Sequence, residues 1–456
     1  MLCCIAGLVL AGCAVGPDYR QPEVKLPDQW QTRQLAQLTN LQEWWAQFDD
    51  PALSTLQRAA QQNSNSLAKA VAAIDKARAN RTSAGASLFP SLYTNGQATE
   101  SGVLNNNSNI SRTASVNLDA SWELDLWGKT RRKTESADAL ISARQADWHD
   151  ARVSLAAEVA SDYVDYRACR VKQLLYEDQV VSQELTASLT RISAEAGFTA
   201  RADAQLADAS TASTAASALA QKVECEVLIK SLVALTSLDE PSLRQTLSQN
   251  PPTLPTVASG LRVDSLSADL LRQRPDLVVS ERELASASAL IGAAEAERYP
   301  SLTLSGSIGV SRTQGASLTK PWSFGPAVSL PIFDGGAISA NIQSARADYD
   351  SALATYRQSV IDAVKEVEQA MVRLDSYAQR EAVQQKSVEG YRAYLDATEK
   401  NLRAGNVSQL DYETARRSSL SAEISLIELK QSRLTSWIAL YKAVGGGWQG
   451  LPGDAL

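Results

Sequence analysis

The sequence predicts a membrane protein built from four β-strands and very long α-helices, arranged as two structural repeats. Three observations support this fold class. Short motifs recur in the same order at a nearly constant spacing, and each recurrence opens a segment in which apolar and polar side chains alternate. Each alternating segment leads into a very long stretch with almost no Gly or Pro. Recurrence at a fixed period indicates repeated units, and period-two alternation indicates strands with two different faces.

The chain begins with an apolar stretch that ends at Cys13 and is followed by a polar segment containing Pro. An apolar core and small residues before a cleavage site are two of the three parts of a secretory signal. Leu10-Ala11-Gly12-Cys13 resembles a bacterial lipobox, which implies a signal peptide over residues 1–12 and an acylated segment over 13–50 that begins at Cys13. Ala14 stands where inner-membrane retention favours Asp, so the resemblance implies the outer membrane. An ordinary signal or a short buried helix is the alternative, because no Lys or Arg precedes Arg20.

Composition argues against several classes of protein. The formal net charge is −7 and no basic cluster opposes it, so a nucleic-acid partner is not expected. His149 is the only His, which leaves little for metal binding or acid–base catalysis, and we expect it on a solvated helix surface. Once Cys3 and Cys4 have left with the signal, the cysteines at 13, 169 and 225 predict neither a disulfide framework nor a metal site. We therefore expect no catalytic residue, cofactor or metal.

Three pairs of motifs define the repeats. They are "LFPSLYTNG" at 88–96 with "RYPSLTLSG" at 298–306, "AGFTARAD" at 196–203 with "AGNVSQLD" at 404–411, and "LVALTS" at 232–237 with "LYKAVG" at 440–445. The spacing is 210 for the first pair and 208 for the other two. The predicted domains are repeat 1 over 51–249, a Pro-rich linker over 250–263, repeat 2 over 264–447 and a C-terminal tail over 448–456.

Each repeat opens with a helix and continues with a pair of strands. The Ala-rich helices, about 51–87 and 264–298, stop before Pro90 and Pro300, because the residue before Pro favours extended geometry. In "TASVNLDASWELDL" at 113–126 one face is apolar and the other polar. The apolar face carries Ala114, Val116, Leu118, Ala120, Trp122, Leu124 and Leu126, and repeat 2 matches it with Leu302, Leu304, Ile308, Val310, Trp322, Phe324, Val328, Leu330 and Ile332.

Two environments fit this alternation, a lipid bilayer and a half-buried sandwich sheet. After residue 13 no apolar run reaches the roughly 18–20 residues of a membrane helix, so any crossing must use strands. The strand length and the tryptophans at 122, 127 and 322 favour lipid. The strand near 92–98 is a weaker prediction, and the segments 102–111 and 312–321 are expected to be polar loops outside the cell.

Each strand pair is followed by a helix of unusual length. The segment 129–196 contains neither Gly nor Pro, and 337–404 contains only Gly390. Such helices would reach about 100 Å. Apolar residues between Ala345 and Ala378 recur about every 3.67 positions, which is typical of straight or slightly right-handed packing that can line a wide cylinder. Each helix should reverse near Gly197 or Gly405 and return as a shorter helix.

The number of strands predicts an assembly. Four membrane strands cannot close, and an eight-stranded barrel from two chains would be filled by its own side chains. Three chains give 12 strands and room for a channel. The fold class is therefore a membrane β-barrel plus a long α-helical barrel, with four strands per chain and a trimer closing a 12-stranded barrel.

Nearly the whole mature chain resembles outer-membrane factors of the TolC family, in the lipoprotein branch that serves tripartite drug-efflux pumps. The resemblance is carried by "DLLRQRPDLVVSERELASASALIGAAEAERYPSLTLSGSIG" at 269–309, "SWELDLWGKTRR" at 121–132, "VGPDYRQP" at 15–22 and "LYKAVGGGWQ" at 440–449. It implies a homotrimeric duct in the outer membrane that extends into the periplasm, meets an adaptor protein and a proton-driven inner-membrane pump, and performs no chemistry itself. Drugs or other small toxic compounds are the implied cargo.

The resemblance also implies a periplasmic aperture on the helix after the second Ala-Gly turn. Matched along Ala404-Gly405, the aperture residues are Leu410, Asp411, Thr414 and Arg417, with Asp203 as the candidate in the first hairpin. Thr414 stands where many relatives carry Asp, and Glu413 or Asp411 could supply the missing charge. The alternative is that Asp411 and Asp203 cap helices. Three copies of Arg417 near one axis would repel one another, so we expect this residue to pair with Asp411, Glu413 or another acidic side chain.

Other functions remain as alternatives. Type I protein secretion and metal-ion efflux use related ducts, and a structural envelope lipoprotein would need only the lipid and the helices. A hydrolase is opposed by the lack of any nucleophile–base or paired-acid constellation.

Overall fold

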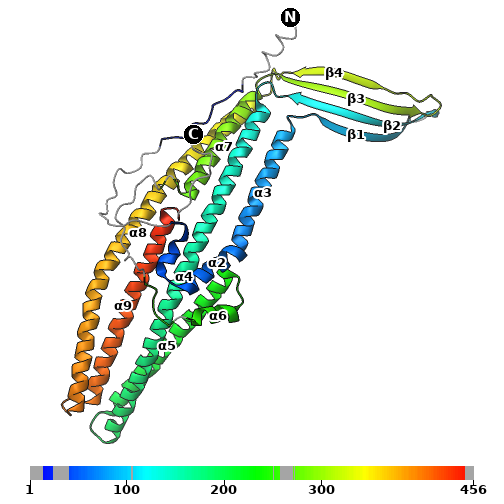
Figure 1. Cartoon of the computed structure of the whole chain (residues 1–456). Helices are drawn as coiled ribbons and strands as arrows, with labels where there is room; N and C mark the ends of the chain where they lie inside the picture. Colours follow the sequence, from blue (N-terminus) through cyan, green and yellow to red (C-terminus); the bar gives the residue numbers. More distant parts are fainter. Residues whose placement is uncertain are drawn as a thin grey trace. The chain divides into compact units, whose positions relative to one another are not determined.

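The computed structural model describes residues 14–23, 41–103, 106–249, 251–256, 271 and 273–446 (Figure 1). The chain divides into two units, which we treat separately. The sheet unit contains residues 70–147 and 276–359 together with 14–23. The hairpin unit contains described residues of 41–69, 148–275 and 360–446.

The sheet unit is built on four antiparallel strands in the order β1-β2-β3-β4. They are β1 (Ser91–Val103), β2 (Asn106–Leu124), β3 (Ser301–Thr313) and β4 (Trp322–Ser329). Two helices lead into the strand pairs, α3 (Asn65–Ala86) and α7 (Pro275–Ala296). Both end shortly before Pro90 and Pro300, which confirms the predicted stops. The strands β1 and β4 form the two edges of the sheet.

The register places the predicted apolar side chains on one face. Leu118 pairs with Ile308, and Ile308 pairs with Trp322, so these three side chains lie in one row across β2, β3 and β4. All three are exposed in the single chain, at 48%, 61% and 77%. The next row, through Asp119 and Ser307, is polar and faces the other way. The alternating pattern in the sequence therefore corresponds to a sheet with one apolar face and one polar face.

The strand boundaries differ from the prediction in four places, and one is β4, which stops at Ser329 and leaves Leu330 and Ile332 beyond the strand. The strand predicted weakly at 92–98 is the 13-residue β1, and β2 begins at Asn106, inside the segment expected to be a loop at 102–111. At its other end β2 stops at Leu124, so Leu126 lies beyond the strand. Polar residues such as Asn and Ser can continue a ladder when a neighbouring strand, here β1, is long enough to pair with them, which side-chain alternation alone does not reveal.

The long helices are confirmed. The helices α4 (Lys129–Glu195) and α8 (Ala337–Arg403) each have 67 residues, and they return as α5 (Arg201–Thr236) and α9 (Gln409–Ala443). The predicted first helix is divided, because Ser64 adopts extended geometry between α2 (Pro51–Asn63) and α3. The short elements η1 (Leu41–Phe48) and α6 (Glu240–Ser248) complete the described structure. Within the described residues no helix has an apolar stretch long enough to cross a membrane.

The core of the hairpin unit joins η1 to the end of α9. The Trp44 ring stacks on Tyr441 at 4.8 Å between centroids, and Phe48 meets the edge of Trp437 at 5.4 Å. Aromatic pairs in these arrangements stabilise a core beyond the area that they bury. These contacts fix the segment before α2 against the end of the second hairpin.

Two cysteines of the hairpin unit correct the sequence-based prediction. Cys169 on α4 and Cys225 on α5 form a disulfide with their Cα atoms 5.6 Å apart. We expected no disulfide framework from the cysteine count. The missed signal is that both residues lie 28 positions from Gly197, on either side of the predicted turn. Equal distances from the turn of an antiparallel hairpin bring two residues to the same level.

His149 is half-buried on α4 rather than solvated as expected, and its ring lies 4.9 Å from that of Trp148 in an edge-on contact. Burial, with a smaller contribution from the positive charge of Arg152, lowers the pKa of His149 from 6.5 to about 4. The unfolded chain therefore takes up this proton at a higher pH than the folded chain.

We expect the His149 site to lower stability as the pH falls. The full stability is present above about pH 6.5 and is lost progressively down to about pH 4. After allowance for the half-exposed ring, the loss is on the order of 1 kcal/mol. Thermal unfolding at pH 7.5 and pH 5.0 checks this, because no other His titrates. The midpoint should fall more in wild type than in His149→Gln, and equal falls in both proteins would contradict the assignment.

Candidate functional site

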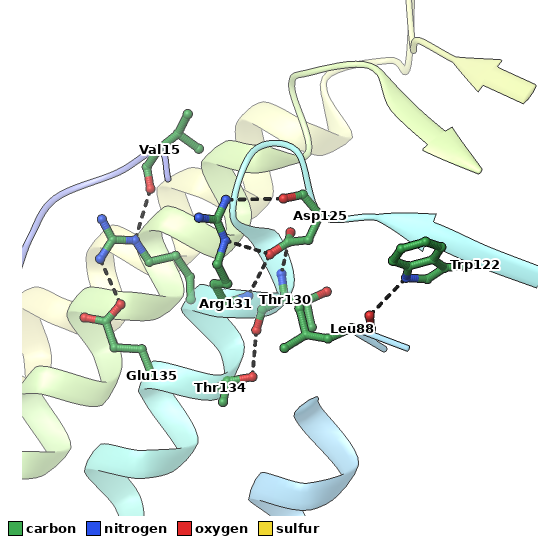
Figure 2. A network of polar contacts seen from close by, with 9 residues as sticks. Val15, Leu88, Trp122, Asp125, Thr130, Arg131, Thr134 and Glu135 are labelled. Carbon is green, nitrogen blue, oxygen red and sulfur yellow. Dashed lines mark hydrogen bonds and ion pairs between the residues drawn. The ribbon is translucent and has the colours of Figure 1, made fainter. Parts of the chain in front are cut away.

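The junction between β2 and α4 is held by one carboxylate (Figure 2). Asp125 accepts hydrogen bonds from the backbone N–H groups of Thr130 and Arg131, both at 3.0 Å, and from the Arg131 side chain at 3.2 Å. A carboxylate at this position satisfies free N–H groups of the first helical turn and complements the helix dipole. Nearby, the Trp122 indole N–H donates to the Leu88 carbonyl at 3.0 Å. Strand and helix are thus joined without a flexible linker.

The segment that follows Cys13 lies against this junction. The N–H of Val15 donates to the Trp127 carbonyl at 3.1 Å, and the Val15 carbonyl accepts from Arg132 Nε at 3.2 Å. Arg132 also forms an ion pair with Asp18 at 2.8 Å. The backbone passes so close to α7 that a Cβ added to Gly292 would lie 2.7 Å from the Val15 carbonyl oxygen. The segment from Val15 to Asp18 is therefore fixed within the sheet unit.

Both hairpins end in the same turn. Gly197 and Gly405 have φ of +81° and +76°, a region that favours Gly. The Phe198 N–H donates to the Ser193 carbonyl at 2.9 Å, and the Asn406 N–H donates to the Asn401 carbonyl at 2.9 Å. The N–H groups of the two glycines donate to the carbonyls three residues before them, at 3.1 Å and 2.9 Å, which completes two Schellman motifs. The repeated Ala-Gly motif thus encodes the reversal of each hairpin.

The two predicted aperture carboxylates sit at helix starts. Asp411 and Ser408 form a reciprocal capping box: the Ser408 N–H donates to the carboxylate at 2.9 Å, and the Asp411 N–H donates to the Ser408 hydroxyl at 3.2 Å. The Ser408 hydroxyl, which donates to the carboxylate at 2.7 Å, and then the Ser408 N–H hold the pKa of Asp411 below its usual value. Asp203 accepts from the Ala200 N–H at 3.3 Å in the same way on α5. Both carboxylates are exposed and bonded to backbone.

Arg417 and Thr414 are brought together one turn further along α9. Arg417 donates to the Thr186 hydroxyl on α4 at 2.8 Å and to the Thr414 hydroxyl at 3.3 Å. Desolvation lowers the pKa of Arg417, and Glu413 opposes this shift. Among the ion pairs of the described residues none includes Arg417, so within one chain it bonds to hydroxyls rather than to the carboxylate that we expected. Leu410 is half-buried on the same part of α9.

Glu413 is the buried acid of this region, with only 1% of the residue exposed. It accepts hydrogen bonds from Ser182 on α4 and from Gln409 Nε2, the latter at 3.0 Å. Arg416 approaches it at 3.8 Å. A buried carboxylate needs such partners to remain charged. We name Ser182, Thr186, Glu413 and Arg417 the α4–α9 polar contact.

The sequence identified one side of this contact. It offered Glu413 as an alternative source of charge but gave no role to Ser182 and Thr186. The spacing of these two residues, i and i+4, is a signal that α4 presents hydroxyls on one face, but it does not identify the helix opposite. Hydrogen bonds and ion pairs of this kind hold helices together and perform no bond-making chemistry.

A sequence model for the family described as outer membrane efflux protein matches residues 56–235 and 266–446. Nodulation protein T of Rhizobium leguminosarum bv. viciae is 32% identical over 451 residues, covering 97% of this chain and 92% of that protein. The toluene efflux pump outer membrane protein TtgC of Pseudomonas putida is 31% identical, covering 99% of this chain and 96% of that protein. This chain belongs to the outer membrane efflux protein family.

A solved structure supports the same assignment. The outer-membrane channel OprN is similar with a TM-score of 0.81 and 30% identity, covering 96% of this chain and all of that chain. Members of this group have a four-stranded antiparallel sheet and mostly helical content in each chain, as this protein does.

Proposed function

We propose that this protein is the outer-membrane exit duct of a tripartite efflux system, a passive trimeric channel that carries drugs or other small toxic compounds to the outside. Relatives described as outer membrane proteins of toluene, solvent and antibiotic efflux pumps support efflux over type I protein secretion. The cargo leaves a periplasmic adaptor and an inner-membrane pump, which we propose to be proton-driven. No catalytic role is assigned to any residue. Within the described residues no cluster of three or more His, Cys, Asp or Glu side chains is arranged to hold a metal ion.

The apolar face of the sheet is the observation that carries this proposal. Large apolar side chains on β2, β3 and β4 lie exposed on one face, and the opposite face is polar. Exposing this much apolar surface to water would be unfavourable, whereas lipid would cover it at no cost. The polar face, including the Asn95–Asp119 hydrogen bond of 2.7 Å, suits the wall of a water-filled channel.

The edges of the sheet support the proposed trimer. In lipid, the open edges β1 and β4 would each leave a row of unpaired backbone groups, at several kcal/mol for each group. Pairing β1 of one copy with β4 of the next removes the edges when the ring closes. Three copies give a 12-stranded barrel, and we propose that the hairpins form an α-helical barrel.

The outer membrane is the location of the family, and the lipid anchor is our further proposal. Cys13 lies outside the described residues, but Val15 and Asp18 just after it are held by α4. An acyl chain on Cys13 would then start from a fixed point of the sheet unit. Metabolic palmitate should label wild type and not Cys13→Ala.

We likewise propose the two repeats, 51–249 and 264–447, as the units of the fold, with the two matched family segments as support.

The experiment that tests the function measures the mass of the purified protein and its channel conductance. Full-length protein purified from outer membranes should have the mass of three chains and should form channels in planar bilayers. A stable monomer or dimer that conducts ions would contradict the architecture. A trimer that does not conduct would contradict the role as a duct.

We propose that Leu410, Asp411, Thr414 and Arg417 line the periplasmic aperture, with Asp203 on the first hairpin. The α4–α9 polar contact would hold α9 against α4 in the closed state. Leu410→Ala combined with Arg417→Ala should raise the single-channel conductance several-fold, because it removes apolar bulk and two hydrogen bonds to hydroxyls. Sensitivity of cells to vancomycin should rise as well.

The control for the aperture is Arg392→Ala, which removes an Arg on α8 that pairs with Glu423 on α9 at 2.8 Å, outside the α4–α9 polar contact. This variant should keep the wild-type conductance. If the double variant assembles as a trimer and conducts like wild type, the aperture lies elsewhere.

A further inference from the structure

An open groove of about 510 Å³ lies between α4, α5, α8 and α9 of the hairpin unit. Its volume falls within the range of small-molecule sites. Its α9 side is lined by hydroxyls at helical spacing: Thr414, Ser418, Ser421 and Ser425. Arg417 is the only charged side chain among the lining residues, all of which are described. The groove is thus lined by polar side chains, and its one charge is the positive charge of Arg417.

The guanidinium of Arg417 keeps donors for a ligand. An Arg side chain has five N–H donors, and Arg417 gives hydrogen bonds to two hydroxyls, those of Thr186 and Thr414. Both acceptors are neutral, and the charge of Glu413 favours the charged form of Arg417 without forming an ion pair with it. Its partial desolvation, which lowers the pKa of Arg417, makes a bound anion more favourable than it would be in bulk water.

The neighbouring carboxylates are held by other partners. Glu413 is buried, bonded to Ser182 and Gln409, and faced by Arg416 at 3.8 Å. Asp411 is bonded to Ser408 in the helix cap. Neither of these two acids lines the groove, so Arg417 is the charged side chain that a ligand in it would meet.

We propose that this groove binds small polar organic anions, solutes that join a carboxylate, sulfonate or phosphate to a hydroxylated body. The anionic group accepts charge-assisted hydrogen bonds from Arg417. The hydroxyls of the body exchange hydrogen bonds with the α9 serines, and a ring can lie on Tyr391, which is 44% exposed. The proposal rests on the proposed function, since it names a class of cargo that the duct would contact near its aperture.

A matched pair of ligands tests the charge requirement. 4-Nitrophenyl β-glucuronide and 4-nitrophenyl β-glucoside differ in a carboxylate against a hydroxymethyl group, and their absorbance allows equilibrium dialysis with the full-length trimer in non-ionic detergent. Wild type should bind the glucuronide about tenfold more tightly than the glucoside. Arg417→Gln should lose this preference. Arg417→Lys should keep part of it, because the charge remains while the planar fork is lost.

Arg392→Gln is the control, since it removes a positive charge on α8 outside the groove and should keep the preference. Equal binding of the two ligands to wild type would overturn the proposal, as would an unchanged preference in Arg417→Gln. If Arg392→Gln lost the preference for the glucuronide as completely as Arg417→Gln, the proposal would also be overturned. The preference would then depend on the net charge of the protein and not on Arg417. Binding is measured without ion flow, so failure of the duct function would appear separately, as trimers that bind but do not conduct.

Discussion

Val116→Arg is expected to abolish assembly of the trimer in the outer membrane. Val116 lies in the middle of β2 on the apolar face and is 59% exposed in the single chain. An Arg near the bilayer midplane costs about 2–4 kcal/mol, and a trimer carries three copies. The cost is therefore about 6–12 kcal/mol for each trimer, comparable to the whole stability of many domains. The measurement is the amount of trimer in outer-membrane fractions on semi-native gels.

The control is the same substitution at Ser115, the residue just before Val116 on β2. Ser115 lies on the opposite, polar face, where it pairs with Gln97 and Ser311. Ser115→Arg introduces the same side chain into a channel wall in contact with water and should leave the amount of trimer close to wild type. If both variants assemble equally well, the apolar face does not contact lipid, and the sheet has a different environment.

Removing the disulfide is expected to loosen α5. Cys169 and Cys225 are 56 residues apart in sequence, and closing a loop of this length stabilises a fold by about 4 kcal/mol in the chain-entropy account. Few side chains of α5 are buried, and Ala207 is the only one described as buried before Cys225. The Cys169→Ala/Cys225→Ala variant should therefore show faster hydrogen exchange in the part of α5 before Cys225, together with a lower unfolding midpoint.

The second hairpin provides an internal reference. There α8 and α9 are joined by ion pairs such as Arg433–Glu381 at 3.0 Å, which the cysteine substitutions leave in place. Exchange in α9 should therefore remain at the wild-type rate. A reducing agent should have no further effect on the double variant. Unchanged exchange in α5 of that variant would mean that helix packing, and not the covalent bond, holds this hairpin.

Features with a local signal could be predicted from the sequence. The alternation on β2, the long helices without Pro and the two Ala-Gly turns are each encoded within one segment, because side-chain periodicity and backbone preference act over a few residues. The break at Ser64 and the early start of β2 at Asn106 were missed. At both places neighbouring segments decide the outcome, and propensity is a weak guide there.

By itself, the sequence determined the four strands, their two unlike faces, the two long hairpins and the family to which the chain belongs. The tertiary structure alone decided which side chains meet between hairpin helices. The Cys169–Cys225 bond, the burial of Glu413 against Ser182 and the contact of Arg417 with Thr186 all join residues more than 50 positions apart. Such pairs depend on the rotation of each helix about its own axis and on the level at which two helices cross. Packing of the whole hairpin sets both, and no single segment carries that information.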